Sequence, residues 1–404
     1  MNSSASFPLD AHTGQSIASV ADLASRIGMP AFDAIRKLYD IHEVSTSRLL
    51  MNTAGWAVTS EVMKLPRDAV ENQVLTMIRD RFTGHEAIIN SLRAKRKVDT
   101  DGADQVSVSA SGPIAAQCRW CREWHVRESA MWADEWGQIV SADRRIGTRP
   151  NWARQSAISA LAFGDERMHC LESLTESEFV GLFDIAERYL GMARHTHPDM
   201  RFCTLFLNGG PKSASSVEHA HVQIVARGDR HFAYPEIVAA RCPPDYWQRL
   251  SDAHAQAGLT ITQGACAAWV SLAPVKEKDI TALSPSVIDG AQFIYRIWRD
   301  LAHEGTRNFS LAAILSPGHV TGSDCPERFA QWPKVVWRFV DRGSPEVAHG
   351  DIGTMELFGS SIVASDPFIV AGTLQRSAAG GRGTQPAAAR GPASKSGKTG
   401  RGTR

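Results

Sequence analysis

Residues 208–223 of the chain read NGGPKSASSVEHAHVQ, a Gly- and Ser-rich loop followed by three polar side chains spaced two apart. Residues 201–207 before the loop are β-prone and residues 219–226 after it alternate, so we expect two paired strands. On a strand, His219, His221 and Gln223 face one side and the apolar residues between them face the other. The polar groups are therefore expected on one face of a rigid sheet.

These residue types suit chemistry at phosphorus. The imidazole of His221 can attack a phosphorus atom and form a covalent intermediate, while N–H groups of the loop can surround phosphate oxygens. The amide of Gln223 can donate a hydrogen bond but cannot give or take a proton. A bare His-x-His is more often two ordinary strand histidines; the preceding loop and the following Gln favour a phosphate site.

The segment resembles the histidine-triad (HIT) superfamily. It resembles the transferase branch in particular, which comprises the galactose-1-phosphate uridylyltransferases and the dinucleoside tetraphosphate phosphorylases and carries Gln where the hydrolases carry a third His. The matching residues are, in order, Asn208, Gly210, Ser216, His219, His221 and Gln223. Ala220 replaces the usual Pro, and Ala214 stands where the loop usually has a second Gly. The resemblance implies that His221 and Gln223 are catalytic and that Asn208, Gly210, Ser215 and Ser216 bind substrate.

A second constellation is Cys118-Arg119-Trp120-Cys121, whose spacing lets both thiolates reach one metal ion. Taken alone, the pair is half of a zinc site, a redox pair or two unrelated buried cysteines. The resemblance to uridylyltransferases implies a structural zinc site formed by Cys118, Cys121, His169 and His219. For His169 the alternatives are a satisfied core histidine, or a role for the neighbouring Cys170 as the ligand in its place.

Composition is ordinary for a globular protein of 404 residues, which is long enough for two or three domains. No apolar stretch has the length of a membrane span and no basic-then-apolar signal opens the sequence, so we expect a cytoplasmic protein without a membrane partner. The seven scattered cysteines agree with a reducing compartment. Residues 377–404 hold six Lys/Arg and no acid, which leaves 38 basic and 43 acidic residues elsewhere, a net charge of −5. We expect this Gly-, Ala- and Ser-rich tail to be disordered.

The middle of the chain reads as a duplication. In the first copy, residues 158–163 lead through Leu174-Thr175-Glu176-Ser177 into an amphipathic helix and then into the strand before Asn208. In the second, residues 269–274 lead through Leu283-Ser284-Pro285-Ser286 into a helix and then into residues 308–315. A Ser or Thr before each helix supplies N-cap oxygens. The resemblance implies an α+β fold with two HIT-like halves, each an antiparallel sheet with flanking helices. We expect a helical N-terminal extension (1–105), a catalytic half (106–232), a degenerate half (233–375) and the basic tail (376–404).

The resemblance implies a nucleotidyltransferase that moves a nucleoside monophosphate, UMP by default, between a nucleotide sugar and a sugar 1-phosphate through a nucleotidyl-histidine. It also implies a homodimer. One alternative is a dinucleoside polyphosphate phosphorylase. The other is a nucleotide-sensing regulator without turnover, in which residues 19–38, with their helix, Gly-turn, helix rhythm, bind DNA. Plain helical hairpins share that rhythm, so we expect no nucleic-acid partner.

Overall fold

The computed structural model describes residues 20–45, 56, 66–71, 73–90, 118, 145–151, 155–213, 219–319, 325–344 and 354–379. Cys121, Ser215, Ser216 and residues 380–404 lie outside the described residues. Residues 376–379, expected at the start of the disordered tail, instead form the end of a helix. Among the helices of the described part, none combines the length and the apolar character needed to cross a membrane.

The helices have the following bounds: α1 Val20–Ile27, α2 Met29–Arg36, α4 Arg67–Glu71, α7 Glu176–Thr196, α8 Ala233–Arg241, α9 Tyr246–Gln256, α10 Val287–His303 and α11 Pro367–Ala379. The strands have the following bounds: β1 Tyr39–Ser45, β2 Val74–Asp80, β3 Glu86–Ile89, β4 Ile146–Pro150, β5 Ile158–Gly164, β6 Phe202–Gly209, β7 His221–Arg227, β8 Thr260–Gln263, β9 Cys266–Val270, β10 Ile280–Ser284, β11 Phe309–Leu315, β12 Val335–Asp341 and β13 Ser360–Val363.

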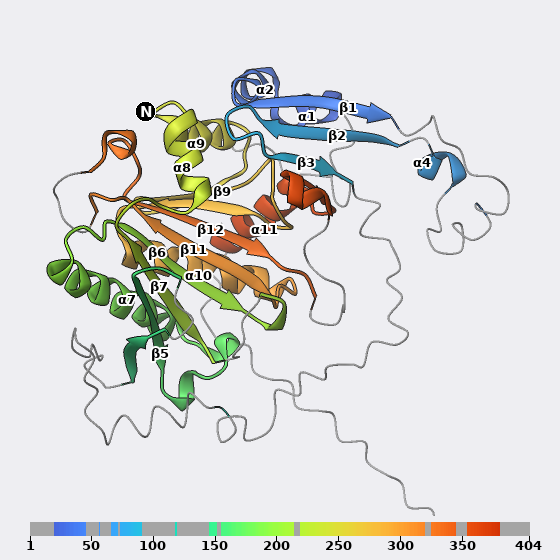
Figure 1. Cartoon of the computed structure of the whole chain (residues 1–404). Helices are drawn as coiled ribbons and strands as arrows, with labels where there is room; N and C mark the ends of the chain where they lie inside the picture. Colours follow the sequence, from blue (N-terminus) through green and yellow to red (C-terminus); the bar gives the residue numbers. More distant parts are fainter. Residues whose placement is uncertain are drawn as a thin grey trace, which may run out of the picture.

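The larger sheet has nine strands in the order β4-β5-β7-β6-β11-β12-β10-β9-β8, and every neighbouring pair is antiparallel. The order is symmetric about its centre: β5-β7-β6 on one side corresponds to β10-β12-β11 on the other. The two halves join where β6 pairs with β11 (Figure 1). This arrangement confirms an α+β fold with two similar halves.

Helices α7 and α10 pack against each other and cover the apolar face of this sheet; in Figure 1, α10 lies behind the strands. Each begins after a Ser or Thr residue, as the sequence predicts. The side chain of Thr175 accepts a hydrogen bond from the backbone N–H of Glu178, and that of Ser286 accepts one from Asp289. Between the helices, Phe179 stacks on Trp298 with a centroid distance of 5.7 Å. Each helix has an apolar stripe that is buried against the sheet and the other helix, and this burial orients both helices.

The second half differs from the predicted duplication in one strand. The counterpart of β5 is β10, residues 280–284. β5 pairs with β7, which follows the central strand β6 in the chain, and β10 pairs with β12, which follows the central strand β11. Of the predicted residues 269–274, only the first two lie in a strand, β9. The connection to the following helix also differs in length. Residues 165–175 separate β5 from α7, whereas Pro285 and Ser286 alone separate β10 from α10. The second half therefore has no segment that corresponds to the one carrying His169.

The expectation of a helical N-terminal extension is only partly correct. Helices α1 and α2 form a hairpin at Gly28, which has a φ of +77°, but the described residues between 39 and 89 add the strands β1, β2 and β3. These join β13 from near the C-terminal end in a four-stranded sheet of order β1-β2-β3-β13. The pair β3–β13 is parallel, so a distant segment of the chain completes the sheet. Because this pairing joins residues far apart in the sequence, local hydrophobic periodicity could not reveal it.

A group of polar side chains lies near the N-terminal sheet, in the second half of the chain. The guanidinium of Arg338 on β12 donates to both carboxylate oxygens of the buried Asp279, at 2.7 and 3.2 Å. It also lies over the ring of Tyr234 on α8, 5.0 Å from the centroid. The hydroxyl of Tyr246 on α9 donates to Asp80 on β2 at 2.6 Å. This last hydrogen bond joins α9 to the N-terminal sheet, whereas the contacts of Arg338 lie within the second half.

Candidate functional site

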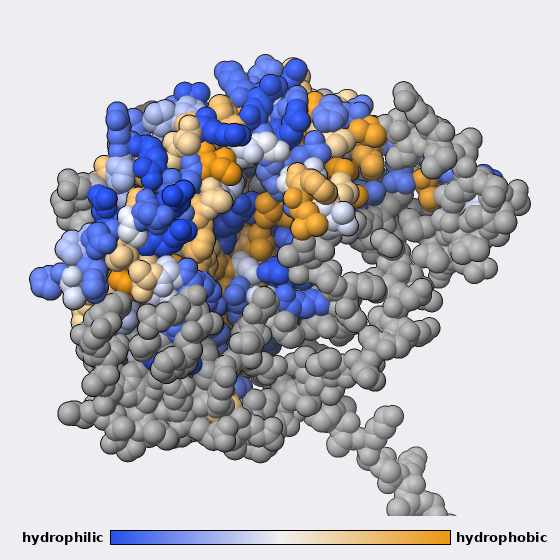
Figure 2. All heavy atoms as spheres, viewed as in Figure 1, coloured by the Kyte–Doolittle hydropathy of each residue, from blue (hydrophilic) through white to orange (hydrophobic). Residues whose placement is uncertain are grey.

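Strand β7 places His221 and Gln223 on the sheet face opposite α7 and α10. Its neighbours are β5 and β6, with His221 across from Phe163, and Gln223 across from Leu161 on one side and Phe206 on the other. The intervening Val222 is fully buried in the core, as the alternation predicts. His221 is itself buried at 7% exposure, while Gln223 is partly exposed. In the view of Figure 2, the described surface is hollowed over the middle of the sheet, between the α8–α9 side and the α11 side.

A backbone carbonyl fixes the protonation of the His221 ring. Nδ1 lies 2.8 Å from the carbonyl oxygen of His219. A carbonyl oxygen only accepts hydrogen bonds, so Nδ1 carries the proton and donates it. In the neutral ring the lone pair is then on Nε2, which makes Nε2 the nucleophilic atom.

The same reasoning applies to the ring of His219. Its Nε2 lies 2.9 Å from the carbonyl oxygen of Gly164 and therefore carries the proton. The lone pair on Nδ1 then points toward the sulfur of Cys118, 3.8 Å away. A histidine that donates one ring N–H to a carbonyl and turns the other nitrogen to a neighbouring thiol has the arrangement of a metal ligand with its outer support.

Cys118, His169 and His219 form a cluster that could hold a metal ion, because one ligand atom from each lies within 4.8 Å of the other two. Bonds of about 2.0–2.3 Å to zinc would separate tetrahedral ligand atoms by about 3.3–3.8 Å, so the three residues fit with a small contraction. Two backbone contacts hold the histidines side by side. Cys170 forms a β-bridge with His219, and Ala220 N–H donates to the carbonyl of His169 at 3.1 Å. The alternative ligand Cys170 is exposed and outside the cluster.

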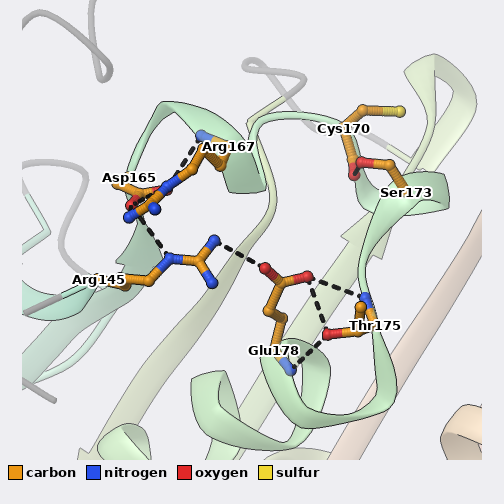
Figure 3. Close-up of polar contacts among 7 residues, drawn as sticks. All are labelled: Arg145, Asp165, Arg167, Cys170, Ser173, Thr175 and Glu178. Carbon is orange, nitrogen blue, oxygen red and sulfur yellow. Dashed lines mark hydrogen bonds and ion pairs between the residues drawn. The ribbon is translucent and has the colours of Figure 1, made fainter. Parts of the chain in front are cut away.

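An ion-pair network braces the segment that carries His169 (Figure 3). Arg145 donates to Asp165, just after β5, at 3.3 Å and to Glu178, in the first turn of α7, at 2.7 Å. Glu178 also completes the capping box with Thr175, and Arg167 pairs with Asp165. These ion pairs and hydrogen bonds hold the pKa of both Asp165 and Glu178 below the usual range, against the opposite effect of burial. Both ends of segment 165–175 are thus fixed.

Burial keeps both histidines neutral. Desolvation lowers the pKa of His219 to about 4, and the nearby rings of His169 and His221 act in the same direction. Desolvation also lowers the pKa of His221, and the positive charge of Arg149 adds to the effect. A neutral imidazole is the form that attacks phosphorus or binds a metal, so the environment favours the reactive form of each ring.

The first part of the predicted phosphate loop is rigid. Gly210 has a φ of +79°, and a Cβ at this position would lie 2.3 Å from Oδ1 of Asn308, so a larger residue is excluded on two grounds. The same Oδ1 accepts a hydrogen bond from the backbone N–H of Lys212 at 3.1 Å. The side chain of Asn208, at the end of β6, lies on the same face as that of His221. The structure thus brings together Asn208, Gly210, His221 and Gln223 at one end of β6 and β7.

Three residues near the site belong to no sequence motif, and the sequence did not predict a role for them. Arg149 on β4 is buried, lies over the ring of Phe163 at 5.7 Å and faces the same side as His221. Gln155, just before β5, donates to the amide oxygen of Gln223 at 3.0 Å. Arg145 belongs to the bracing network. Their positions depend on the pairing of β4, β5 and β7, and a lone Arg or Gln gives no local signal.

His221 and Gln223 form a polar row on β7, and the described strands of the second half carry no equivalent of it. On the same sheet face, β12 presents Val336, Arg338 and Val340, without histidine or glutamine. Arg338 is occupied by Asp279 and Tyr234. His319, which follows β11, contacts Glu187 on α7 at 3.1 Å. In the described part of the chain, the polar row is therefore confined to the first half.

Comparison with protein-family models and with curated protein sequences finds no match. Among solved structures, the chain is similar to an ADP-glucose phosphorylase from Arabidopsis thaliana with bound ADP-glucose, at 14% identity and a TM-score of 0.51, over 74% of this chain and 98% of that one. It is also similar to a GalT-like protein from Arabidopsis thaliana, at 13% identity and a TM-score of 0.44, over 59% and 87%. An Ap4A phosphorylase from yeast in complex with Ap4A aligns at 12% identity and a TM-score of 0.35, over 74% and 87%.

The first of these likenesses bears on the fold, because its TM-score exceeds 0.5 and it covers nearly all of the other chain. The chain therefore has an α+β fold of two similar halves, shared with the ADP-glucose phosphorylase.

Proposed function

We propose that this chain is a nucleotidyltransferase that moves a nucleoside monophosphate between a nucleotide sugar and a sugar 1-phosphate. The observation that carries the proposal is the contact of His221 Nδ1 with the His219 carbonyl, which directs the lone pair of Nε2 away from the backbone. A buried, neutral imidazole with a fixed tautomer on a rigid strand is suited to nucleophilic attack at phosphorus.

In the first step, Nε2 of His221 attacks the α-phosphorus of the nucleotide sugar. A P–N bond forms, the P–O bond to the sugar 1-phosphate breaks, and that phosphate leaves with the electron pair. In the second step, a phosphate oxygen of the incoming sugar 1-phosphate attacks the same phosphorus and the P–N bond breaks. The ring of His221 returns neutral, so neither step needs a residue that donates or removes a proton.

Neighbouring groups stabilise the charge that develops on the transferred phosphoryl group. Gln223 lies two residues from His221 on the same face and offers amide N–H donors. Asn208, Gly210 and the loop residues Ser215 and Ser216 supply further donors to the phosphate oxygens. Gln in this position cannot transfer a proton to the leaving group or to water. This property favours transfer to a second phosphate over hydrolysis.

A structural zinc ion is part of the proposal, with Cys118, Cys121, His169 and His219 as its ligands. The three described ligands already lie together. When bound, the ion would hold the ring of His219 and supply no group to the reaction. His219 in turn holds His221 through its carbonyl oxygen, so the ion would stabilise the position of the nucleophile.

UMP remains our default for the transferred group. Adenine nucleotides are the main alternative. The substrate would then be ADP-glucose, or diadenosine tetraphosphate, which a phosphorylase would split with His221 and Gln223. The test is intact-mass measurement after separate incubation with UDP-glucose, ADP-glucose and diadenosine tetraphosphate. We expect an acid-labile adduct of one UMP or one AMP, and its mass identifies both the base and the chemistry.

The variant His221→Gly should form no adduct with any of the three compounds. A matched control is His319→Asn, which removes a histidine of the second half and should label like the wild type. Absence of an adduct from the metal-loaded wild type with all three compounds would contradict the proposal. Tight binding without an adduct would instead support a nucleotide-sensing protein.

A further inference from the structure

Gln155 lies three residues before β5, outside every motif of the sequence. Its backbone N–H lies 3.4 Å from the hydroxyl of Ser159 on β5. The next residue, Ser156, donates from its hydroxyl to the carbonyl of Ala226 on β7 at 2.8 Å. Residues 155 and 156 are thus attached to β5 and to β7, the strand that carries Gln223.

The side chain of Gln155 reaches back along this strand to the proposed site. Its Nε2 donates to Oε1 of Gln223 at 3.0 Å. A glutamine amide has one oxygen acceptor and one NH₂ donor group. Because the oxygen of Gln223 is turned toward Gln155, its NH₂ group is turned the other way.

This orientation matters for the proposed reaction, because the oxygens of a transferred phosphoryl group accept hydrogen bonds and carry negative charge. An NH₂ group stabilises them, whereas an amide oxygen in the same position would repel them. We propose that Gln155 is a positioning residue that sets the amide of Gln223 with its NH₂ toward the transferred phosphoryl group. The inference rests on the proposed function and assigns a role to a residue that does not itself touch the substrate.

The hydrogen-bonding capacity of residue 155 provides the test. Gln155→Leu removes the donor, and we expect kcat for nucleotidyl transfer to fall about threefold to tenfold, the effect of one hydrogen bond, with little change in KM. Gln155→Glu presents only acceptor oxygens, which attract the NH₂ of Gln223 and turn its oxygen toward the phosphoryl group, so kcat should fall further. Gln155→Lys presents only donors and should restore most of the activity lost in the Leu variant.

A double-mutant cycle separates positioning from a general structural effect. If Gln155 acts through Gln223, Gln155→Leu should not lower kcat further in a Gln223→Ala background. Thermal midpoints of all variants exclude misfolding, and Gln256→Leu, an exposed glutamine on α9, serves as the matched control. The substrate is whichever of UDP-glucose, ADP-glucose or diadenosine tetraphosphate labels the wild type.

The two proposals fail in different ways. Absence of labelling in the wild type overturns the proposed function. A labelled wild type with Leu, Glu and Lys variants of equal activity overturns the role of Gln155. An undiminished effect of Gln155→Leu in the Gln223→Ala background does so as well.

Discussion

The ring of His221 and the backbone of His219 are joined by a 2.8 Å hydrogen bond from Nδ1 to the carbonyl oxygen. The ring of His219 belongs to the cluster with Cys118 and His169. His219 therefore belongs to the candidate metal cluster through its side chain and holds the candidate nucleophile, His221, through its main-chain carbonyl. Disturbance of the cluster is expected to reach His221 without any direct contact between the metal and the substrate.

Removal of the metal should reduce covalent labelling of His221. We expect the purified protein to contain about one zinc ion per chain by elemental analysis, and a chelator to lower both the thermal midpoint and the yield of adduct. Restoration of zinc should recover both quantities. A protein that labels fully after its metal has been removed would contradict the link through His219.

His169 and Cys170 should differ sharply as candidate ligands. His169→Asn removes a member of the cluster, so the zinc content and the thermal midpoint should fall. Cys170→Ser changes an exposed thiol outside the cluster and should leave the zinc content unchanged. Loss of zinc in the Cys170 variant would show that the neighbouring cysteine is the true ligand.

Arg145 should stabilise the segment that carries His169. Arg145→Met leaves Asp165 and Glu178 without a shared partner, and we expect a loss of about 1–3 kcal/mol in the free energy of unfolding, together with weaker zinc binding. The control is Arg167→Met, because Arg167 also pairs with Asp165 but its side chain is 63% exposed. Exposed ion pairs contribute little, so this variant should stay close to the wild type. Equal losses in both variants would argue against a specific role for Arg145.

The stability of the second half should depend on Asp279. Its carboxylate is fully buried and pairs with Arg338, whose side chain is 25% exposed, so Asp279→Asn leaves a partly buried positive charge without its counterion. We expect a loss of about 1–3 kcal/mol on urea unfolding. Asp229→Asn makes the same change in an ion pair on the surface and should unfold like the wild type. A small effect at Asp279 would mean that Arg338 finds another partner.

Acid should destabilise the fold partly through His254, which is completely buried against Tyr39 and Trp269. Desolvation lowers its pKa from 6.5 to about 4. Between these values the unfolded chain binds a proton that the folded chain does not, so stability falls as the pH decreases through this window, by at most about 3 kcal/mol for this residue. His254→Phe keeps a ring but cannot titrate, so its unfolding free energy should change less between pH 7 and pH 4.5.

The control for this experiment is His195→Phe, at the exposed C-terminal end of α7, which should keep the pH dependence of the wild type. An unchanged slope in the His254 variant would show that other groups cause the acid sensitivity.

The sequence alone determined the features that depend on local pattern. Alternation put His221 and Gln223 on one face of a strand, and a Ser or Thr before each helix marked the starts of α7 and α10, because period and capping act within a few residues. The repeated order of strand, helix and strand, together with the resemblance that residues 208–223 carry, also predicted the two-half fold.

Only the tertiary structure decided which groups meet from distant parts of the chain. It turned His169 rather than Cys170 into the cluster, fixed the ring protons through the carbonyls of Gly164 and His219, and brought Gln155 to Gln223. It also completed the N-terminal sheet with β13. Each of these contacts depends on strand register and on backbone carbonyls, which every residue has, so no residue type in the sequence could announce them.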